Sequence, residues 1–280
     1  MANTRCTPVE KGGTVVPPSD FQSDTTISPM NKGIQANPSR PCGRCVRERT
    51  RTHAQRLNVL IACEESQAEC IAFRELGHNA YSCDIQPCRK RGLPQFHIQG
   101  DVTPYLDGQT HFSTMDGSAH WVHHWDLIIA HPPCTYLCKV GSQWLYYNPD
   151  AVIWRYGKFV RVNSERLECM YQAKEFFIKC LAAKANYVAV ENPIPMRLAN
   201  LPKPSFYACP SWFGVKYTKK TLYWVKNLPP LFAETIYPEP KCFVHCSRGK
   251  YRARTFRELA QAIAKQWSEF ILNDKRQNRE

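Results

Sequence analysis

The sequence has no uncharged apolar stretch of about 18 residues, the length that a membrane-spanning helix needs, so we expect no membrane anchor. Its first residues, MANTRCTPVEKGGTVVPP, lack the apolar core of a secretory signal peptide. No internal repeat is visible either. These absences favour a globular protein of the cytoplasm.

Acidic side chains are scarce. The chain has 24 Asp and Glu against 37 Lys and Arg, a formal net charge of +13. A basic surface attracts polyanions, of which nucleic acid is the commonest. Part of the excess lies in residues 1–56, whose Pro, Ser, Thr and charge predict a flexible basic arm, and in a charged tail at residues 274–280. The charge favours DNA as a partner, while a role in solubility alone stays open.

A complete pair of CxxC motifs is also missing, although the chain has 14 cysteines. Because these are scattered through the expected strands and helices of a long chain, we expect most of them to be reduced and buried. The spacing of Cys42 with Cys45, and of Cys242 with Cys246, provides half a zinc site in each of two distant segments. We therefore expect no metal centre and keep these four residues only as weak candidates.

Apolar runs of strand length alternate with helical patterns from residue 57 onward. Strands are expected at 57–63, 80–84, 125–131, 187–192 and 219–226, and helices at 65–78, 164–184 and 255–272. Ser66 and Glu69 predict a capping box at the start of the first helix. The alternation predicts an α/β domain over residues 57–273, with a parallel sheet and helices on both of its faces.

Polar residues stand at the ends of four of these strands. They are Cys63-Glu64-Glu65, Asp84, His131-Pro132-Pro133-Cys134 and Glu191-Asn192-Pro193. In parallel α/β sheets, ligands bind outside the carboxyl ends of the strands. The sequence therefore predicts that these residues line one cleft.

Two of these residues suggest catalysis. Cys134 follows two prolines, which fix the backbone at a strand end, so its thiol is a candidate nucleophile; an inert buried cysteine is the alternative. Glu191 ends another apolar strand, where an unpaired buried carboxylate is costly. It either completes a local hydrogen-bond network or meets a ligand, and both readings stay open.

In this order, HPPC and ENP resemble the two catalytic motifs of the cytosine-C5 DNA methyltransferases, which usually read GPPCQ and ENV. The resemblance covers roughly residues 57 to 270 and includes FGVKYTKKTLYW, which is similar to a later strand motif of that family. It implies a Rossmann-like class I methyltransferase sheet, S-adenosylmethionine as cofactor and DNA as substrate. The chain looks like the compact, phage-encoded branch, which implies a location in the host cytoplasm. We expect a monomer, although the sequence leaves the oligomeric state open.

The resemblance also implies roles for individual residues. Cys134 would attack C6 of cytosine, and Glu191, with a raised pKa, would donate a hydrogen bond or proton at N3. Pro133 and Asn192 complete these two motifs. The implied cofactor residues are Cys63, Glu64, Glu65, Asp84, Asp101 and His131. The implied nucleic-acid contacts are Lys219, Lys220 and Thr221.

The chain departs from the family in its first motif, where CEESQ at residues 63–67 replaces a glycine-rich loop. Glycines let a cofactor approach the backbone closely, whereas the glutamates would engage its amino group or belong to a different ligand. Two other functions therefore stay open: methyl transfer to an exocyclic amine (N4 or N6), and nucleic-acid binding by a catalytically silent protein on this scaffold. Only residues 227–254 are available for target recognition, so we expect low sequence specificity.

Overall fold

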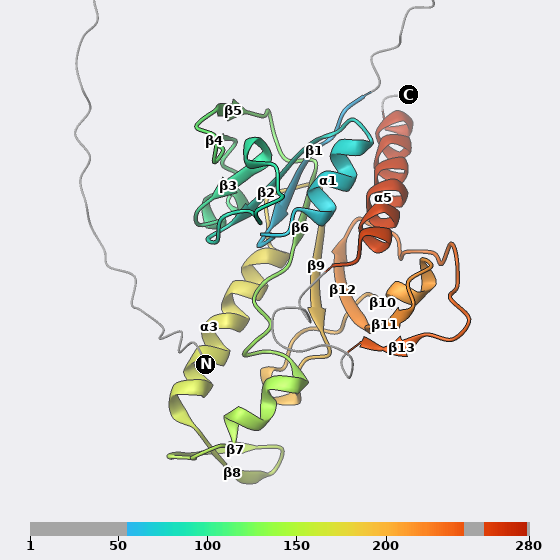
Figure 1. The fold of residues 1–280 in the computed structure, drawn as a ribbon. Coiled ribbons are helices and arrows are strands. Elements are labelled where there is room, and N and C mark those ends of the chain that lie inside the picture. The colour runs from blue at the N-terminus through green and yellow to red at the C-terminus, as the bar shows by residue number, and fades with distance from the viewer. Residues whose placement is uncertain (1–54, 244–254, 279–280) are drawn as a thin grey trace, which may run out of the picture. The chain divides into compact units, whose positions relative to one another are not determined.

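The computed structural model describes residues 55–243 and 255–278, and its centre is a seven-stranded, mostly parallel sheet (Figure 1). The strand order is β10-β12-β9-β6-β1-β2-β3. Strand β12 runs antiparallel to both of its neighbours, and the other adjacent pairs are parallel. The bounds are β1 (Asn58–Ala62), β2 (Asn79–Asp84), β3 (His97–Gln99), β6 (Leu127–Ala130), β9 (Tyr187–Pro193), β10 (Phe206–Ala208) and β12 (Thr221–Lys226).

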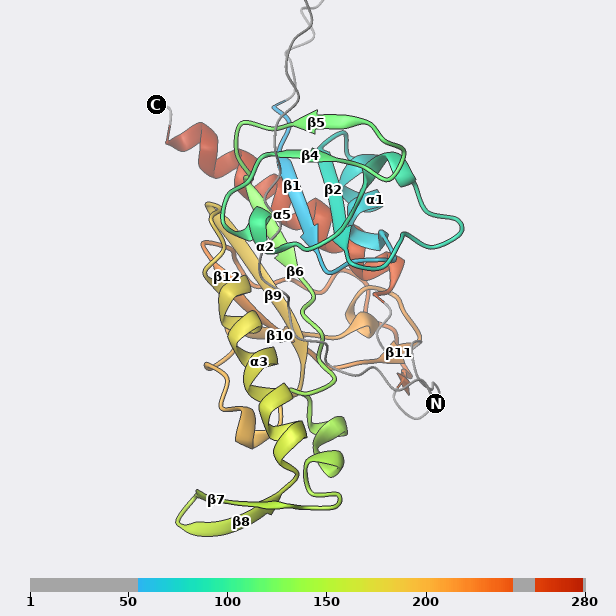
Figure 2. The same cartoon turned by 90° about the vertical axis from the view of Figure 1, so that its left-hand side faces the viewer.

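Helices cover both faces of this sheet, as Figures 1 and 2 show. Successive strand residues point to opposite faces, so Leu60 of β1 joins one core and Ile61 the other. The first core contains side chains of α2 (Thr103–Leu106) and α3 (Ser164–Leu181), and the second those of α1 (Ala68–Glu75) and α5 (Arg257–Gln277). The predicted α/β class with helices on both faces is confirmed.

The remaining elements are short. They are β4 (His111–Ser113), β5 (Ala119–Trp121), β7 (Ala151–Arg155), β8 (Lys158–Val162), β11 (Tyr217–Thr218), β13 (Lys241–Cys242) and the 3-10 turns η1 (Pro94–Phe96), η2 (Lys139–Leu145), η3 (Arg197–Ala199) and η4 (Pro210–Trp212). Strands β4 and β5 form one antiparallel hairpin, and β7 and β8 form another. Neither hairpin was predicted from the sequence.

Two boundaries differ from the prediction. The first helix begins only at Ala68. Its N-cap residue is Gln67, which has a left-handed backbone (φ 58°) and whose side chain makes no capping hydrogen bond. The last helix continues through Asp274 and Lys275, which the sequence assigned to a charged tail. Both side chains reach the sheet, because Asp274 accepts a hydrogen bond from a tyrosine of β9 and Lys275 pairs with an aspartate before β6. The predicted arm lies outside the described residues, except for positions 55 and 56.

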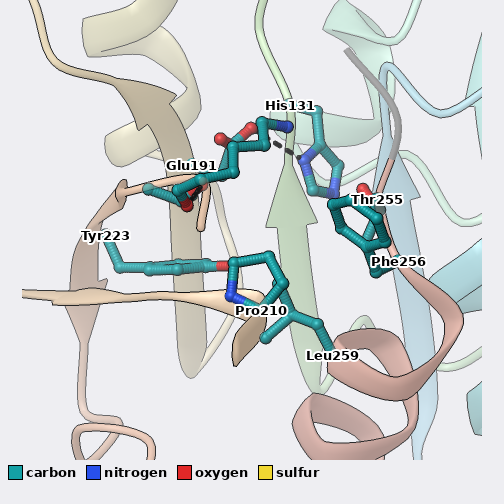
Figure 3. Close-up of a pocket in the computed structure, with 9 residues that line it drawn as sticks. His131, Glu191, Pro210, Tyr223, Thr255, Phe256 and Leu259 are labelled. Carbon is teal, nitrogen blue, oxygen red and sulfur yellow. Dashed lines mark hydrogen bonds and ion pairs between the residues drawn. The ribbon is translucent and has the colours of Figure 1, made fainter. Parts of the chain in front are cut away.

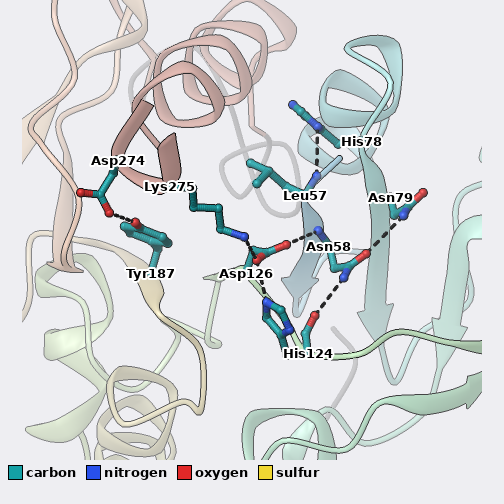
Figure 4. A network of polar contacts seen from close by, with 9 residues as sticks. All are labelled: Leu57, Asn58, His78, Asn79, His124, Asp126, Tyr187, Asp274 and Lys275. Atoms are coloured by element: carbon teal, nitrogen blue, oxygen red, sulfur yellow. Dashed lines mark hydrogen bonds and ion pairs between the residues drawn. The ribbon is translucent and has the colours of Figure 1, made fainter. Parts of the chain in front are cut away.

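A network of hydrogen bonds and ion pairs lies at the amino ends of the parallel strands, which we call the amino edge of the sheet (Figure 4). The buried carboxylate of Asp126, just before β6, accepts hydrogen bonds from the Asn58 backbone (2.7 Å) and from Lys275, and it lies 2.9 Å from His124 Nε2. Tyr187 donates to Asp274 nearby. The network joins α5 to the starts of β1, β6 and β9 and so fixes the positions of these strands. The opposite ends of the strands, which we call the carboxyl edge of the sheet, are fixed with them.

Candidate active site

The carboxyl edge brings together the strand ends that the sequence singled out. Strand β6 pairs in parallel with β1 on one side and β9 on the other, with Ala130 opposite both Ala62 and Val190. The residues that follow β6 and the last residues of β9 are therefore neighbours in space. HPPC and ENP thus meet at the carboxyl ends of neighbouring strands, while the single cleft expected for all four groups stays a prediction.

His131 joins the two motifs directly (Figure 3). Its Nδ1 lies 3.3 Å from Glu191 Oε2, and its Nε2 lies 3.1 Å from Glu69 Oε2. Burial lowers the pKa of His131, but the charges and hydrogen bonds of Glu69 and Glu191 raise it well above its usual value. The site therefore holds an imidazolium between two carboxylates, with both ring nitrogens donating.

The same contacts correct the prediction that Glu191 has a raised pKa. Burial does raise it, but the hydrogen bond from His131 and the charge of Lys219 lower it more, so the net shift is downward. Glu191 is therefore ionised at neutral pH. The raised pKa in this pair belongs to His131 instead.

Glu64 has a structural role that the sequence did not suggest. Its two buried carboxylate oxygens accept hydrogen bonds from the backbone nitrogens of Glu69 (2.8 Å) and Cys70 (3.3 Å) at the start of α1. Burial and the neighbouring Glu69 raise the pKa of Glu64 to about 7. These contacts do not fit the expected cofactor role of Glu64, and they replace the expected capping box of Ser66 and Glu69.

Three buried acceptor atoms in this region have no hydrogen-bond partner among the described residues. They are Glu69 Oε1, Glu191 Oε1 and Asn192 Oδ1. Buried polar atoms in native proteins are almost always paired, because leaving one unpaired costs about 1–3 kcal/mol. Two of these atoms belong to Glu69 and Glu191, the carboxylates that contact His131, so they are available to a ligand that carries hydrogen-bond donors.

A pocket opens beside this cluster. It is lined by His131, Glu191, Pro210, Lys219, Thr221, Tyr223, Thr255, Phe256 and Leu259 (Figure 3). Of the three residues expected to contact nucleic acid, Lys219 and Thr221 line this pocket, whereas Lys220 lies over the ring of Tyr207 at 4.2 Å. Thr221 is buried and its hydroxyl donates to the Lys219 carbonyl, so its side chain supports the backbone of the pocket wall.

Cys134 lies in the loop that follows β6 and is half-buried. Its thiol hydrogen-bonds to that of Cys138, which the sequence analysis overlooked. This bond, burial and the charge of Glu191 raise the pKa of Cys134, against the influence of Lys219. The pKa of Cys138 is lowered to about 6, because Cys134 and nearby backbone groups donate to its sulfur. The two thiols therefore influence each other's ionisation directly.

An arginine from α3 holds this loop in shape. Arg166 Nη2 donates to the Thr135 carbonyl (2.9 Å) and the Gly141 carbonyl (3.3 Å), and its guanidinium lies 4.8 Å from the Tyr136 ring centre. A Cβ at Gly141 would lie 2.5 Å from the Thr135 carbonyl oxygen, too close for any side chain. The prolines also differ in setting, since Pro132 is buried and Pro133 exposed.

The other expected cofactor residues form a second group beside β1 and β2. Burial, followed by the charges of Cys180, Asp84, Cys83 and Asp101, raises the pKa of the Cys63 thiol well above its usual value, so the two aspartates lie within electrostatic range of Cys63. Asp84 accepts from the Gln86 backbone through Oδ1 (2.8 Å), and its Oδ2 accepts no hydrogen bond from the described residues. Exposed Glu65 pairs with an arginine instead. The Asp84 carboxylate, half-buried with one oxygen to spare, fits a ligand that carries hydroxyl groups.

The weak zinc candidates gain no support. Cys242 is exposed and free, and no group of three or more metal-ligating side chains occurs within residues 55–243 and 255–278. Cys42, Cys45 and Cys246 lie outside the described residues. No helix in the described part of the chain is long and apolar enough to cross a membrane.

Comparison with known proteins gives little beyond this geometry. No known family profile matches the chain, and no curated protein is similar to it. One solved structure, a candidate DNA modification methyltransferase encoded within an E. coli prophage, is similar at a TM-score of 0.36 and 12% identity. The similarity spans 66% of this chain and about half, 53%, of the other. The functional argument therefore rests on the site itself.

Proposed function

We propose that this chain is an S-adenosylmethionine-dependent methyltransferase that modifies C5 of cytosine in DNA, with Cys134 as its nucleophile. The observation that carries the proposal is the hydrogen bond between His131 and Glu191. It joins the first residue of HPPC, after β6, to the first residue of ENP, on β9, and both of these side chains line one pocket. Cys134 is near enough to Glu191 and Lys219 for their charges to change its pKa.

The sheet topology supports this proposal. Counted along the chain, the five parallel strands β3-β2-β1-β6-β9 have the order 3-2-1-4-5 of doubly wound nucleotide-binding sheets. The strand order reverses between β1 and β6, where such sheets bind their ligands. Cys63 and His131 follow those two strands directly.

The side chains can perform the chemistry expected at a pyrimidine. The Cys134 sulfur would form a bond to C6 as its proton passes to the Cys138 thiolate, which makes C5 electron-rich. The ionised Glu191 would accept a hydrogen bond from the exocyclic amine of the base. His131 would supply the proton that N3 needs, passing it through Glu191, to which it is already hydrogen-bonded.

The cofactor would occupy the neighbouring group at the ends of β1 and β2. Asp84 would hold its ribose hydroxyls, with Cys63 and Asp101 beside it. S-adenosylmethionine supplies an electrophilic methyl group when bound. The formal charge of +13 supports DNA as the substrate, because a basic surface stabilises a strand whose base is turned out of the duplex.

A trapping experiment tests the proposal. Purified protein is incubated with labelled S-adenosylmethionine and duplex DNA that contains 5-fluorocytosine, whose fluorine prevents release of a C6 adduct after methyl transfer. We expect a covalent protein–DNA complex that survives denaturation, is absent in Cys134→Ser and persists in Cys88→Ser, a half-buried cysteine outside the site.

Other outcomes would contradict it. Methyl transfer that survives Cys134→Ser would indicate an exocyclic-amine methyltransferase. DNA binding with neither cofactor binding nor transfer would indicate a silent nucleic-acid-binding protein. A wild-type protein that methylates normal DNA but gives no adduct would show that Cys134 is not the nucleophile.

A further inference from the structure

The β7–β8 hairpin exposes an apolar face that the fold does not use. Cross-strand partners share a face, so Val152 and Trp154 lie on the same side as Arg161 and Phe159. Val152 and Trp154 are each 60% exposed and Phe159 is 74% exposed. The two aromatic rings meet edge to face, with centroids 4.8 Å apart. We call these four residues the outer hairpin face.

The opposite face of the hairpin already anchors it to the body. Ala151, Ile153 and Val160 pack against the first core, and Val162 is fully buried within it. Burial of this inner face is sufficient to hold the hairpin in place. The aromatic residues on the outer face are therefore not required for folding, and exposed apolar patches of this kind usually mark an interaction site.

The hairpin tip is held firmly. Tyr156 and Gly157 both have positive φ angles, 53° and 74°, which suits a two-residue hairpin turn but is unusual for tyrosine. The Tyr156 hydroxyl donates to the Arg197 carbonyl (2.7 Å), and the Arg197 guanidinium lies over the tyrosine ring at 4.1 Å. The outer face is thus presented in a fixed orientation, which lowers the entropic cost of binding a partner.

The charge of the hairpin is of one sign. Residues 151–162 contain Arg155, Lys158 and Arg161 and no acidic residue. The nearest carboxylate, Asp150, is engaged in hydrogen bonds of 2.7 Å with the backbone nitrogen and hydroxyl of Ser164. Exposed aromatic rings among positive side chains are the features by which proteins bind single-stranded nucleic acid. A second copy of this basic face would repel it rather than pair with it.

The hairpin is connected to both halves of the candidate active site. It lies between the Cys134 loop and α3 in the chain, and its tip contacts Arg197, shortly after Glu191 on β9. Figures 1 and 2 both show it beyond the carboxyl edge of the sheet, at the start of α3. Two further exposed rings lie nearby in the sequence, Trp144 in the turn η2 and Tyr147 just after it, with centroids 5.8 Å apart.

We propose that the outer hairpin face docks unpaired nucleotides of the nucleic-acid substrate. Bases stack on Trp154 and Phe159, while Arg161, on the same face, contacts a phosphate; Arg155 and Lys158, a cross-strand pair at the hairpin tip, add positive charge from the other side. This inference deepens the proposed function, on which it rests for the identity of the substrate. The binding itself requires neither cofactor nor methyl transfer, so the two proposals can fail separately.

Binding of fluorescent oligonucleotides to the full chain tests the inference by anisotropy. The ligands are a 20-nucleotide single strand, its perfect duplex and a duplex with one mismatched pair. Stacking on an aromatic side chain contributes about 1–3 kcal/mol per base, so we expect Trp154→Ala with Phe159→Ala to weaken single-strand binding at least about tenfold. Arg161→Ala should reduce the slope of log affinity against log salt by about 1.

The matched control is Trp121→Ala, an exposed tryptophan on the β4–β5 hairpin, which should bind as the wild type does. Trp154→Phe keeps an aromatic ring and should keep most of the affinity, which separates stacking from a folding defect. Circular dichroism should be unchanged in all variants because the altered side chains are exposed.

Several results would overturn the inference. One is equal single-strand affinity for the wild type and the double variant. Another is a wild-type dimer that the double variant converts to a monomer, because the face would then be covered by a second copy. Binding of the wild type, but not the double variant, to neutral lipid vesicles would show a membrane contact instead. Loss of binding in the double variant, with no methyl transfer by any protein, would support the docking surface and contradict only the proposed function.

Discussion

Buried polar clusters lie at both ends of the parallel strands, at the amino edge and the carboxyl edge of the sheet. The two clusters differ in how many of their polar atoms have a hydrogen-bond partner. At the amino edge, Asp126 receives hydrogen bonds from a backbone amide and a lysine and lies beside a histidine, and none of its atoms is left unpaired. At the carboxyl edge, Glu69 and Glu191 share one histidine, and each keeps a buried oxygen without a partner. Both clusters are built from carboxylates and cations, so composition alone does not distinguish them.

This difference separates a structural cluster from a functional one. A fully paired buried network contributes to stability and fixes the positions of the elements that it joins. A cluster with orphaned acceptors is destabilising until a ligand supplies donors. We therefore expect substitutions at the amino edge to change stability, and substitutions at the carboxyl edge to change activity.

The largest expected effect is on catalysis. Glu191→Gln replaces the charged acceptor for the base amine by a neutral amide and removes the carboxylate through which the His131 proton reaches the base, so methyl transfer should fall by about 10²–10⁴-fold. The free energy of unfolding should change by less than about 2 kcal/mol, because one orphaned charge disappears with the carboxylate. Transfer of labelled methyl groups and urea titration measure the two quantities. A large loss of stability with unchanged methyl transfer would show that the cluster at the carboxyl edge is structural rather than functional.

The amino edge should show the opposite pattern. Asp126→Ala leaves the charge of Lys275 unpaired and a backbone amide of β1 without its acceptor, which should lower the free energy of unfolding by about 3–5 kcal/mol. Asp107→Ala breaks the exposed pair with Lys179 and should cost less than about 1 kcal/mol. Adduct formation at low temperature, where the variant remains folded, should stay near the wild-type rate; a strong decrease would contradict a purely structural role.

The loop that carries the nucleophile should respond to a single methyl group. In Gly141→Ala, the new Cβ would meet the Thr135 carbonyl at 2.5 Å and displace the loop that Arg166 holds, at a cost of about 1–3 kcal/mol. The rate of Cys134 alkylation by iodoacetamide, followed by peptide mass spectrometry, should change as the thiol leaves Cys138. Gly92→Ala creates similar crowding elsewhere, against Gln67 at 2.5 Å, and should leave that rate unaltered.

The smallest effect is on the pH dependence of stability. Glu64 titrates near pH 7 in the folded chain and near its ordinary 4.5 when unfolded, so the folded chain binds more protons between these values. Stability should therefore fall as the pH rises from 5 to 8, by at most about 3 kcal/mol. The raised pKa of His131 acts in the same direction at higher pH, whereas the lowered pKa of Glu191 matters only in acid.

Urea titrations at pH 5, 6, 7 and 8 measure this dependence. Glu64→Gln should flatten it, whereas Glu65→Gln, which breaks only an exposed pair with Arg89, should retain the wild-type slope. An unchanged slope in Glu64→Gln would show that another group is responsible.

The main features of the fold and the meeting of two motifs could be predicted from local patterns. Apolar runs of strand length predicted four of the five parallel strands but not the three-residue β3, and Cys134 and Glu191 stood out because neither belongs at the end of an apolar strand. Glu69 could not be found in this way, because its spacing from Ser66 is equally typical of a helix cap. Its role depends on the contact between Glu69 of α1 and His131 after β6, which only the tertiary structure provides.

Other features of the structure were only weakly indicated by the sequence. Cys138 follows Cys134 by four residues, but without the loop geometry that spacing does not predict a thiol pair. The β7–β8 hairpin had a usable signal: two short alternating segments around Tyr156-Gly157. The raised pKa expected for Glu191 was wrong because burial was considered without the histidine that accompanies it.

The packing of α5 on α1 has a consequence for how the chain folds. Arg257 of α5 contacts Glu75 of α1 across 182 residues of sequence, and the second core is shared between these two helices. Closing so long a loop is slow, and any intermediate that forms the first core alone leaves Phe73 and Ile61 facing water. Aggregation during refolding should therefore depend on α5 docking, so a chaperone that shields this apolar surface should raise the yield of native protein more than one that speeds strand pairing.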